Sequence, residues 1–171
     1  MSQGDEIEAR VAADIAQHGW HVVLVPPEGN TPGWAHSIGL QESFGHPEIV
    51  VFGMDLEVLG PLLNRLGEAI RAGERFEADC ERDGILQGLS VSFRPVDARW
   101  IPTFLGNAAW HYQRQDVAVL QVFWPDASGR FPWDPDSDAV WRQDQPLLHH
   151  RETHLALSEA LVAVLQREGA L

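Results

Sequence analysis

Hydrophobic residues recur every three to four positions in four separate parts of the chain. In the first part, Ile7, Val11 and Ile15 are spaced by four residues, with alanine and polar residues between them. A period near 3.6 residues places such side chains on one face of a helix, so the pattern predicts amphipathic helices. The predicted helices cover residues 5–17, 55–72, 100–113 and 151–167.

Other segments alternate between apolar and polar residues, or stay apolar for a few residues, as β-strands do. In residues 34–40, Trp34, His36 and Ile38 fall on one face and the other face carries only small residues. Residues 49–52 are all apolar, which indicates a central strand buried on both faces. Strands are predicted at residues 21–25, 34–40, 48–52, 89–94 and 117–124, with a short one near Phe76.

The remaining segments are predicted to be loops, chiefly residues 41–47, most of 74–88 and 130–138. The first three strands follow one another without an intervening helix, so a strictly alternating βαβ arrangement is excluded. We therefore predict an α+β fold in which a mostly antiparallel or mixed central β-sheet is flanked by helices. A length of 171 residues favours a single globular domain over residues 1–171.

Composition narrows the partners that we expect. The formal net charge is -13, which argues against nucleic acid or an anionic membrane, because both are bound by neutralising negative charge. A basic protein, or a small polar or anionic ligand, remains as a partner. The sequence gives no sign of the oligomeric state.

All basic residues other than histidine are arginine, because the sequence contains no lysine. Chemistry that needs a Schiff-base lysine or a phosphate-binding lysine is therefore excluded, and an arginine-rich, lysine-free chain is typical of a GC-rich bacterial genome. Cys80 is the only cysteine, so no disulfide can form within the chain. The acidic N-terminus has no apolar signal region and no run is long enough to span a bilayer, so we expect a cytoplasmic protein.

Three segments rich in glycine and aromatic residues stand out: residues 33–40 (GWAHSIGL), 44–53 (FGHPEIVVFG), and 120–126 (LQVFWPD) with 129–133 (GRFPW). Together they resemble the DUF 4262 family, a bacterial domain of unknown function. The likeness covers about residues 19–145 and leaves the terminal helices outside. Members often carry Tyr-Thr where this chain has His36 and Ser37, so this chain has no phenol at that position. The resemblance implies no activity, since the family has no assigned reaction.

Residue types alone give weak support to nucleophilic or metal chemistry. Cys80 lies between Asp79 and Glu81, which disfavour a thiolate, and Ser37 lacks a nucleophile-elbow motif. His150 and His154 would share one helical face, as zinc-binding pairs do, with His149 beside them. We interpret these three as exposed histidines at the start of a terminal helix, and we predict no metal and no cofactor.

A stronger hypothesis gathers polar and aromatic residues from strands and loop ends. His36 and His46 are the acid/base candidates, because histidine exchanges a proton near neutral pH. Arginine would clamp an anion and tryptophan would stack on a flat ring. The candidate ligand-binding residues are Trp34, Arg94, Trp110, His111, Gln121, Asp126 and Arg130. The alternative is structural: Arg94, Asp126 and Arg130 would form a salt-bridge network that holds residues 131–133 in place.

Two classes of function follow. The first is a small-ligand-binding or enzymatic cleft that uses these His and Arg groups, with its reaction unassigned. The second is a non-catalytic interaction module whose acidic surface docks a basic protein. The placement of His and Arg favours the first class.

Overall fold

The computed structural model describes residues 2–171, which fold around one β-sheet. The elements, in chain order, are α1 (Gln3–His18), β1 (His21–Val25), β2 (Trp34–Ile38), α2 (Leu40–Phe44), β3 (Glu48–Phe52), α3 (Leu56–Arg71), β4 (Cys80–Leu86), β5 (Leu89–Pro95), the 3-10 turn η1 (Ala98–Trp100), α4 (Ile101–Phe104), α5 (Gly106–Tyr112), β6 (Val119–Phe123), α6 (Ala139–Asp144), α7 (Thr153–Ala156) and α8 (Glu159–Arg167). No helix within residues 2–171 combines the length and the hydropathy that crossing a bilayer demands.

The six strands are ordered β1-β2-β3-β6-β5-β4. Every neighbouring pair is antiparallel except β3 and β6, which are parallel and meet at the centre of the sheet. All residues of β3 and β6 are buried, in agreement with the apolar run that predicted a central strand. The prediction of an α+β fold with a mixed sheet flanked by helices is confirmed.

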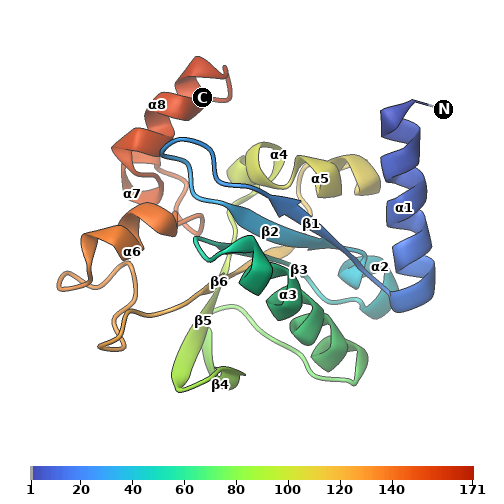
Figure 1. The fold of residues 1–171 in the computed structure, drawn as a ribbon, viewed down its shortest axis with the longest axis horizontal. Helices are drawn as coiled ribbons and strands as arrows, with labels where there is room; N and C mark the ends of the chain where they lie inside the picture. Colours follow the sequence, from blue (N-terminus) through green and yellow to red (C-terminus); the bar gives the residue numbers. More distant parts are fainter. Residues whose placement is uncertain (1) are drawn as a thin grey trace.

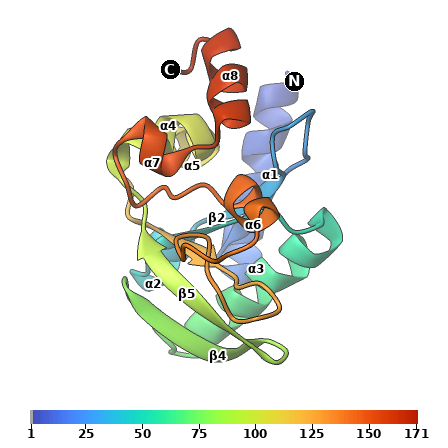
Figure 2. The same cartoon turned by 90° about the vertical axis from the view of Figure 1, so that its left-hand side faces the viewer.

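Helices cover both faces of the sheet (Figures 1 and 2). On one face, which we call the α3 face, the apolar stripe of α3 packs against residues such as Ile49 and Val51 of β3. On the other, which we call the α5 face, α1, α4, α5 and α8 pack against residues that include Val50 and Phe52. Alternate side chains of β3 thus pack into two separate hydrophobic cores, one on each face of the sheet.

Two segments that were predicted to be loops are regular. Residues 40–44 form α2, which begins after Gly39 and ends at Gly45. Residues 80–86 form β4, an edge strand whose charged and glycine residues hide the usual alternation. An edge strand has only one neighbour and an exposed side, so its sequence carries a weak hydrophobic signal.

Two predicted helices are broken. Residues 100–113 form η1, α4 and α5, because Leu105 (φ -124°, ψ 39°) leaves the helical conformation just before Gly106. Residues 151–167 form α7 and α8, because Leu157 is extended and Ser158 caps α8 by accepting a hydrogen bond from Leu161 N (3.3 Å). By contrast, the helix predicted over residues 5–17 is present as α1, which ends at Gly19 (φ 102°).

Candidate functional site

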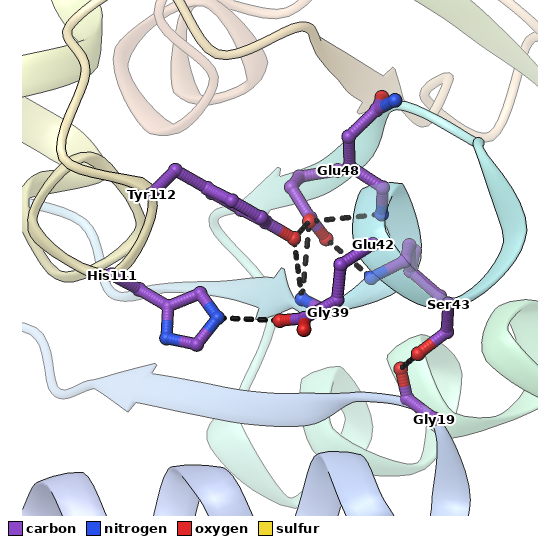
Figure 3. A network of polar contacts seen from close by, with 9 residues as sticks. Gly19, Gly39, Glu42, Ser43, Glu48, His111 and Tyr112 are labelled. Atoms are coloured by element: carbon purple, nitrogen blue, oxygen red, sulfur yellow. Dashed lines mark hydrogen bonds and ion pairs between the residues drawn. The ribbon is translucent and has the colours of Figure 1, made fainter.

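A buried carboxylate organises the junction between β2, α2 and β3. Glu48, the first residue of β3, has no exposed surface, although its side chain ends in a carboxyl group. Its carboxylate accepts hydrogen bonds from Ser37 Oγ (2.8 Å) and from the backbone N–H groups of Gly39 (3.1 Å), Leu40 (3.2 Å) and Gln41 (3.2 Å). Figure 3 shows this carboxylate at the start of α2. Such a fully bonded buried charge acts as a structural anchor.

The end of α5 is tied to the same junction by two neighbouring residues (Figure 3). Tyr112 Oη donates to Glu48 Oε2 at 2.5 Å and accepts from Gly39 N–H at 3.1 Å. Burial and the adjacent Glu48 carboxylate raise the pKa of Tyr112, so the phenol stays protonated as a donor. His111 Nε2 lies 2.5 Å from Glu42 Oε1 on α2. We call the contacts of His111 and Tyr112 the α5 latch.

Gly39 has a backbone conformation that this junction requires. Its φ of 115° is one that residues with a side chain rarely adopt, and a Cβ there would lie 2.8 Å from Gly19 O. Ser43 Oγ donates to the same Gly19 carbonyl at 2.7 Å. The turn between α1 and β1 is therefore fixed against α2.

An open groove lies beside this rigid junction, between α1, β1 and α5. We call it the edge groove. Its volume is about 880 Å³, within the range of ligand sites. Ile7 and Val11 line it from α1, four consecutive residues of β1 (His21, Val22, Val23 and Leu24) border it, and Trp110 lines it from α5. Trp110 is 60% exposed, an unusual state for so large an apolar side chain.

A histidine–carboxylate pair lies at the wall of the edge groove. His21 Nδ1 is 2.6 Å from Asp14 Oδ2, and both residues line the groove. Because a carboxylate only accepts, Nδ1 carries the proton that His21 donates to Asp14. The pair thus provides one histidine that is oriented by its carboxylate partner.

The two histidines that were predicted as acid and base lie on opposite faces of the sheet. His36 is on the α5 face, 1% exposed, and its Nδ1 donates to Ser37 O at 3.2 Å. Burial lowers its pKa to about 4. His46 has no exposed surface and packs edge-on against Phe76 of the α3-face core, with ring centroids 6.0 Å apart. The structure therefore does not bring His36 and His46 together.

Both ring nitrogens of His46 are engaged with the backbone. Nδ1 donates to Pro47 O at 2.8 Å, and Nε2 accepts from Phe76 N–H at 3.0 Å. This pattern requires the neutral ring, and burial lowers the pKa of His46 accordingly. His46 fixes the loop before β4 to the loop before β3, which is a structural role.

The other predicted residues fall into three groups. Trp110 lines the edge groove, and His111 lines it while holding the α5 latch. Trp34 is stacked on Phe52 and donates its indole N–H to Phe104 O at 2.9 Å, beside a smaller pocket of about 520 Å³ near α8. The rest, Arg94, Gln121, Asp126 and Arg130, lie toward the other end of the sheet, where the chain after β6 crosses it.

At that end of the sheet, the side chains of Gln121 and Asp126 are hydrogen-bonded to backbone groups. Gln121 donates to Pro146 O (2.7 Å) and accepts from Leu148 N–H (3.3 Å). Asp126 accepts from Ser128 N–H (2.9 Å) and Arg130 N–H (3.0 Å) and so closes a turn. These bonds, which lower the pKa of Asp126, hold the segment after β6 in place.

The proposed salt-bridge network takes a different form. Arg94 lies 4.3 Å above the Trp133 ring and 3.5 Å from Asp79, while Arg130 Nη1 donates to Asp136 O at 2.9 Å. Among residues 2–171, no ion pair joins Asp126 to either arginine. The segment is therefore held by cation–π and backbone contacts instead of salt bridges.

The histidines near the last helices do not form a metal site in the described part of the chain. His150 precedes α7, which begins at Thr153, so it shares no helical face with His154. Within residues 2–171, no cluster of three His, Cys, Asp or Glu side chains could hold a metal ion. His149 lies instead among aromatic rings, edge-on to Phe123 and Trp133, and burial lowers its pKa to about 4.

Asp14, His21, Glu48 and Tyr112 were not predicted. Glu48 carried a signal, because a charged residue joined directly to the apolar residues 49–52 must find partners when the strand is buried. Tyr112 is the only tyrosine in the sequence and lies within the helix predicted over residues 100–113. Asp14 and His21 carried no signal, since their contact depends on how α1 turns back toward β1.

The fold is an α+β domain with a mixed sheet and an open groove at one edge. The model of the family described as domain of unknown function (DUF4262) matches residues 14–138. The chain therefore belongs to this family. No curated protein and no solved structure shows significant similarity to the chain.

Proposed function

We propose that this protein is a ligand-binding protein and that the edge groove is its binding site. The observation that carries the proposal is the combination of an open groove of about 880 Å³ with Trp110 held 60% exposed at its wall. Ligand sites are concave, mostly apolar, and contain a few polar groups that orient the ligand. The ligand that fits is elongated and mainly apolar, with polar groups along its length.

The α5 latch supports a binding role for Trp110. The two residues that follow it, His111 and Tyr112, are bonded to Glu42 and Glu48 and fix the end of α5. An aromatic side chain on a rigid element loses little entropy when it binds, which is why exposed tryptophans are frequent binding anchors.

Binding is a better account than catalysis. The predicted acid/base residues, His36 and His46, are buried and have lowered pKa values, so neither ring is available at the groove. The Asp14–His21 pair is the polar feature that would orient a ligand at the wall of the groove. Arg94 and Arg130 take no part, because they serve the other end of the sheet.

The cellular setting belongs to the same proposal. A single cysteine, half-buried and free, is the usage expected of a reducing compartment, and we propose the cytoplasm. The arginine-only basic composition supports a bacterial source.

The test monitors the indole N–H signal of Trp110 by NMR. Seven tryptophans give seven indole N–H signals in an ¹⁵N-labelled sample, and Trp110→Phe identifies the one of interest. In a screen of small-molecule fragments, we expect compounds that shift this signal and raise the melting temperature, and the rise in melting temperature should be lost in Trp110→Ala. Leu155→Ala, at an apolar residue that is 50% exposed outside the groove, is the matched control and should change neither. A screen in which fragments perturb only the other indoles contradicts the proposal.

A further inference from the structure

The two edges of the sheet differ in how they are protected. β4 at one edge carries Glu81, Arg82 and Asp83, and its register with β5 shifts between Arg82 and Leu86. Charged residues and bulges are the usual means of preventing an edge strand from pairing with another chain. β1 at the other edge has neither: it is His-Val-Val-Leu-Val, pairs with β2 in unbroken register over its whole length, and leaves Leu24 46% exposed.

The edge groove runs along the unpaired side of β1. Consecutive strand residues point to opposite faces, so a space bordered by His21, Val22, Val23 and Leu24 in turn must follow the strand's edge. Apart from the ladder with β2, residues 21–25 make no backbone hydrogen bond to any other part of residues 2–171. The outward N–H and C=O groups of β1 therefore face the groove.

We propose that the edge groove binds an extended polypeptide segment of another protein, which adds to the sheet as a seventh strand beside β1. This inference rests on the proposed binding function and names its ligand class. Backbone groups of β1 supply the hydrogen bonds, as in other cases of strand addition. A partner of about five residues matches the length of β1, roughly 16 Å.

The walls of the groove select a single strand in preference to a second copy of this protein. In Figure 1, α1 stands beside β1, with α5 above the sheet. A second copy would bring its own α1 alongside its own β1. Pairing of two β1 edges would therefore place two α1 helices in the space beside the paired strands. An isolated extended segment carries no such obstruction and places alternate side chains toward Trp110 on one face and Leu24 on the other.

The charge of α1, which forms the outer wall of the groove, indicates which residues should accompany the apolar residues of the bound segment. α1 carries Asp5, Glu6 and Glu8 in exposed positions near its N-terminus, with Arg10 as its only Arg. Of these four residues, Glu8 and Arg10 line the groove itself. The whole chain has a formal net charge of -13. The partner is therefore an extended segment with apolar residues at alternate positions and basic residues beside them.

The experiment selects peptides of about ten residues, roughly twice the length of β1, from a random displayed library on the full chain. We expect selected peptides that alternate apolar residues, contain Arg or Lys, and bind more weakly as salt is raised. Trp110→Ala and Leu24→Ala should each weaken the Kd by about tenfold. Leu155→Ala is again the control and should leave the Kd unchanged.

Backbone methylation of a selected peptide tests strand pairing without altering the protein. Two versions of the peptide are compared, each methylated on every second amide nitrogen, with the two sets of positions offset by one residue. Only alternate amides of a strand face its neighbour, so one version should lose binding and the other should keep it. Equal losses in both versions, or enriched peptides that ignore Trp110 and Leu24, overturn the inference.

The two proposals fail in distinguishable ways. Fragments that bind at Trp110 while no peptide is selected there would leave the binding function standing and remove the peptide inference. Failure of both screens at Trp110 removes both. Dimerisation that rises with protein concentration and is lost in Leu24→Arg would replace the inference with self-association.

Discussion

The two ends of the α5 face carry similar side chains but use them differently. Near β5 and β6, Gln121 and Asp126 bond to backbone groups of the segment that follows β6, and that segment covers the sheet. Near β1, the latch fixes α5 while Trp110 and the outer edge of the strand remain open. Polar side chains that are fully bonded to backbone build the fold, whereas a site needs groups left free beside an open space.

The largest effect is expected from removing the anchor at the open end. Glu48→Ala leaves several buried backbone N–H groups and the Tyr112 hydroxyl without their acceptor, which should lower the free energy of unfolding by about 4 kcal/mol. Urea unfolding measures this change. Glu42→Ala, on the adjacent short helix α2 and with its side chain 45% exposed, is the control and should cost about 0.5 kcal/mol. A cost below that of Gln121→Met would reverse our ranking of the two ends.

The second effect concerns pH. The pKa of His36 is lowered to about 4 by burial, from an ordinary value of 6.5. The unfolded chain therefore binds a proton between pH 6.5 and pH 4 that the folded chain does not bind. Stability is full above pH 6.5 and falls as the pH drops toward 4, by up to about 3 kcal/mol from His36 alone.

His149 and His46 have pKa values lowered in the same direction and add to this loss. Unfolding free energies measured from pH 7 to pH 4 should fall less steeply in His36→Leu, whatever its stability at pH 7. His154→Gln, at an exposed position, should keep the wild-type slope. An unchanged slope in His36→Leu would mean that the buried ring accepts a proton without cost.

The third effect tests the covered end. Gln121→Met keeps the side-chain volume but removes the bonds to Pro146 O and Leu148 N–H, which should cost about 2 kcal/mol. Proteolysis between β6 and α7 should also become faster, because the covering segment is released. Gln143→Met, at an exposed residue of α6, is the control for both measurements.

The smallest effect on folding is expected at Trp110. Trp110→Ala should change the free energy of unfolding by less than about 0.5 kcal/mol, because the side chain is largely exposed. Trp100→Ala, in the core with no exposed surface, should cost about 4 kcal/mol. If Trp110→Ala is as damaging as Trp100→Ala, the indole belongs to the core and the binding proposal loses its anchor.

Hydrophobic periodicity predicted most of the strands, because a buried strand needs apolar residues at its buried positions. The run at residues 49–52 identified the central strand, and α1 and α3 were found from their apolar spacing. β4 was missed because an edge strand with Glu81, Arg82 and Asp83 has no such pattern. The breaks at Leu105 and Leu157 were missed because the apolar spacing continues across them.

The site was harder to predict than the fold. Trp110 and His111 were chosen from residue type and line the edge groove, whereas His36 and His46 were grouped although they lie on opposite faces of the sheet. Residue type shows what a side chain can do, and it does not show which backbone groups the side chain will satisfy. The pairing of Asp14 with His21 depends on the path of α1, which no local pattern encodes.

The parallel pairing of β3 with β6 has a consequence for how the chain folds. Its partners, such as Glu48 and Val119, are about 70 residues apart in sequence, whereas β1 to β3 and the β4–β5 hairpin form from neighbouring segments. The two local units must therefore find each other across one central seam. We expect this joining step to set the folding rate, so substitutions in the seam should slow folding more than substitutions at the β1 edge.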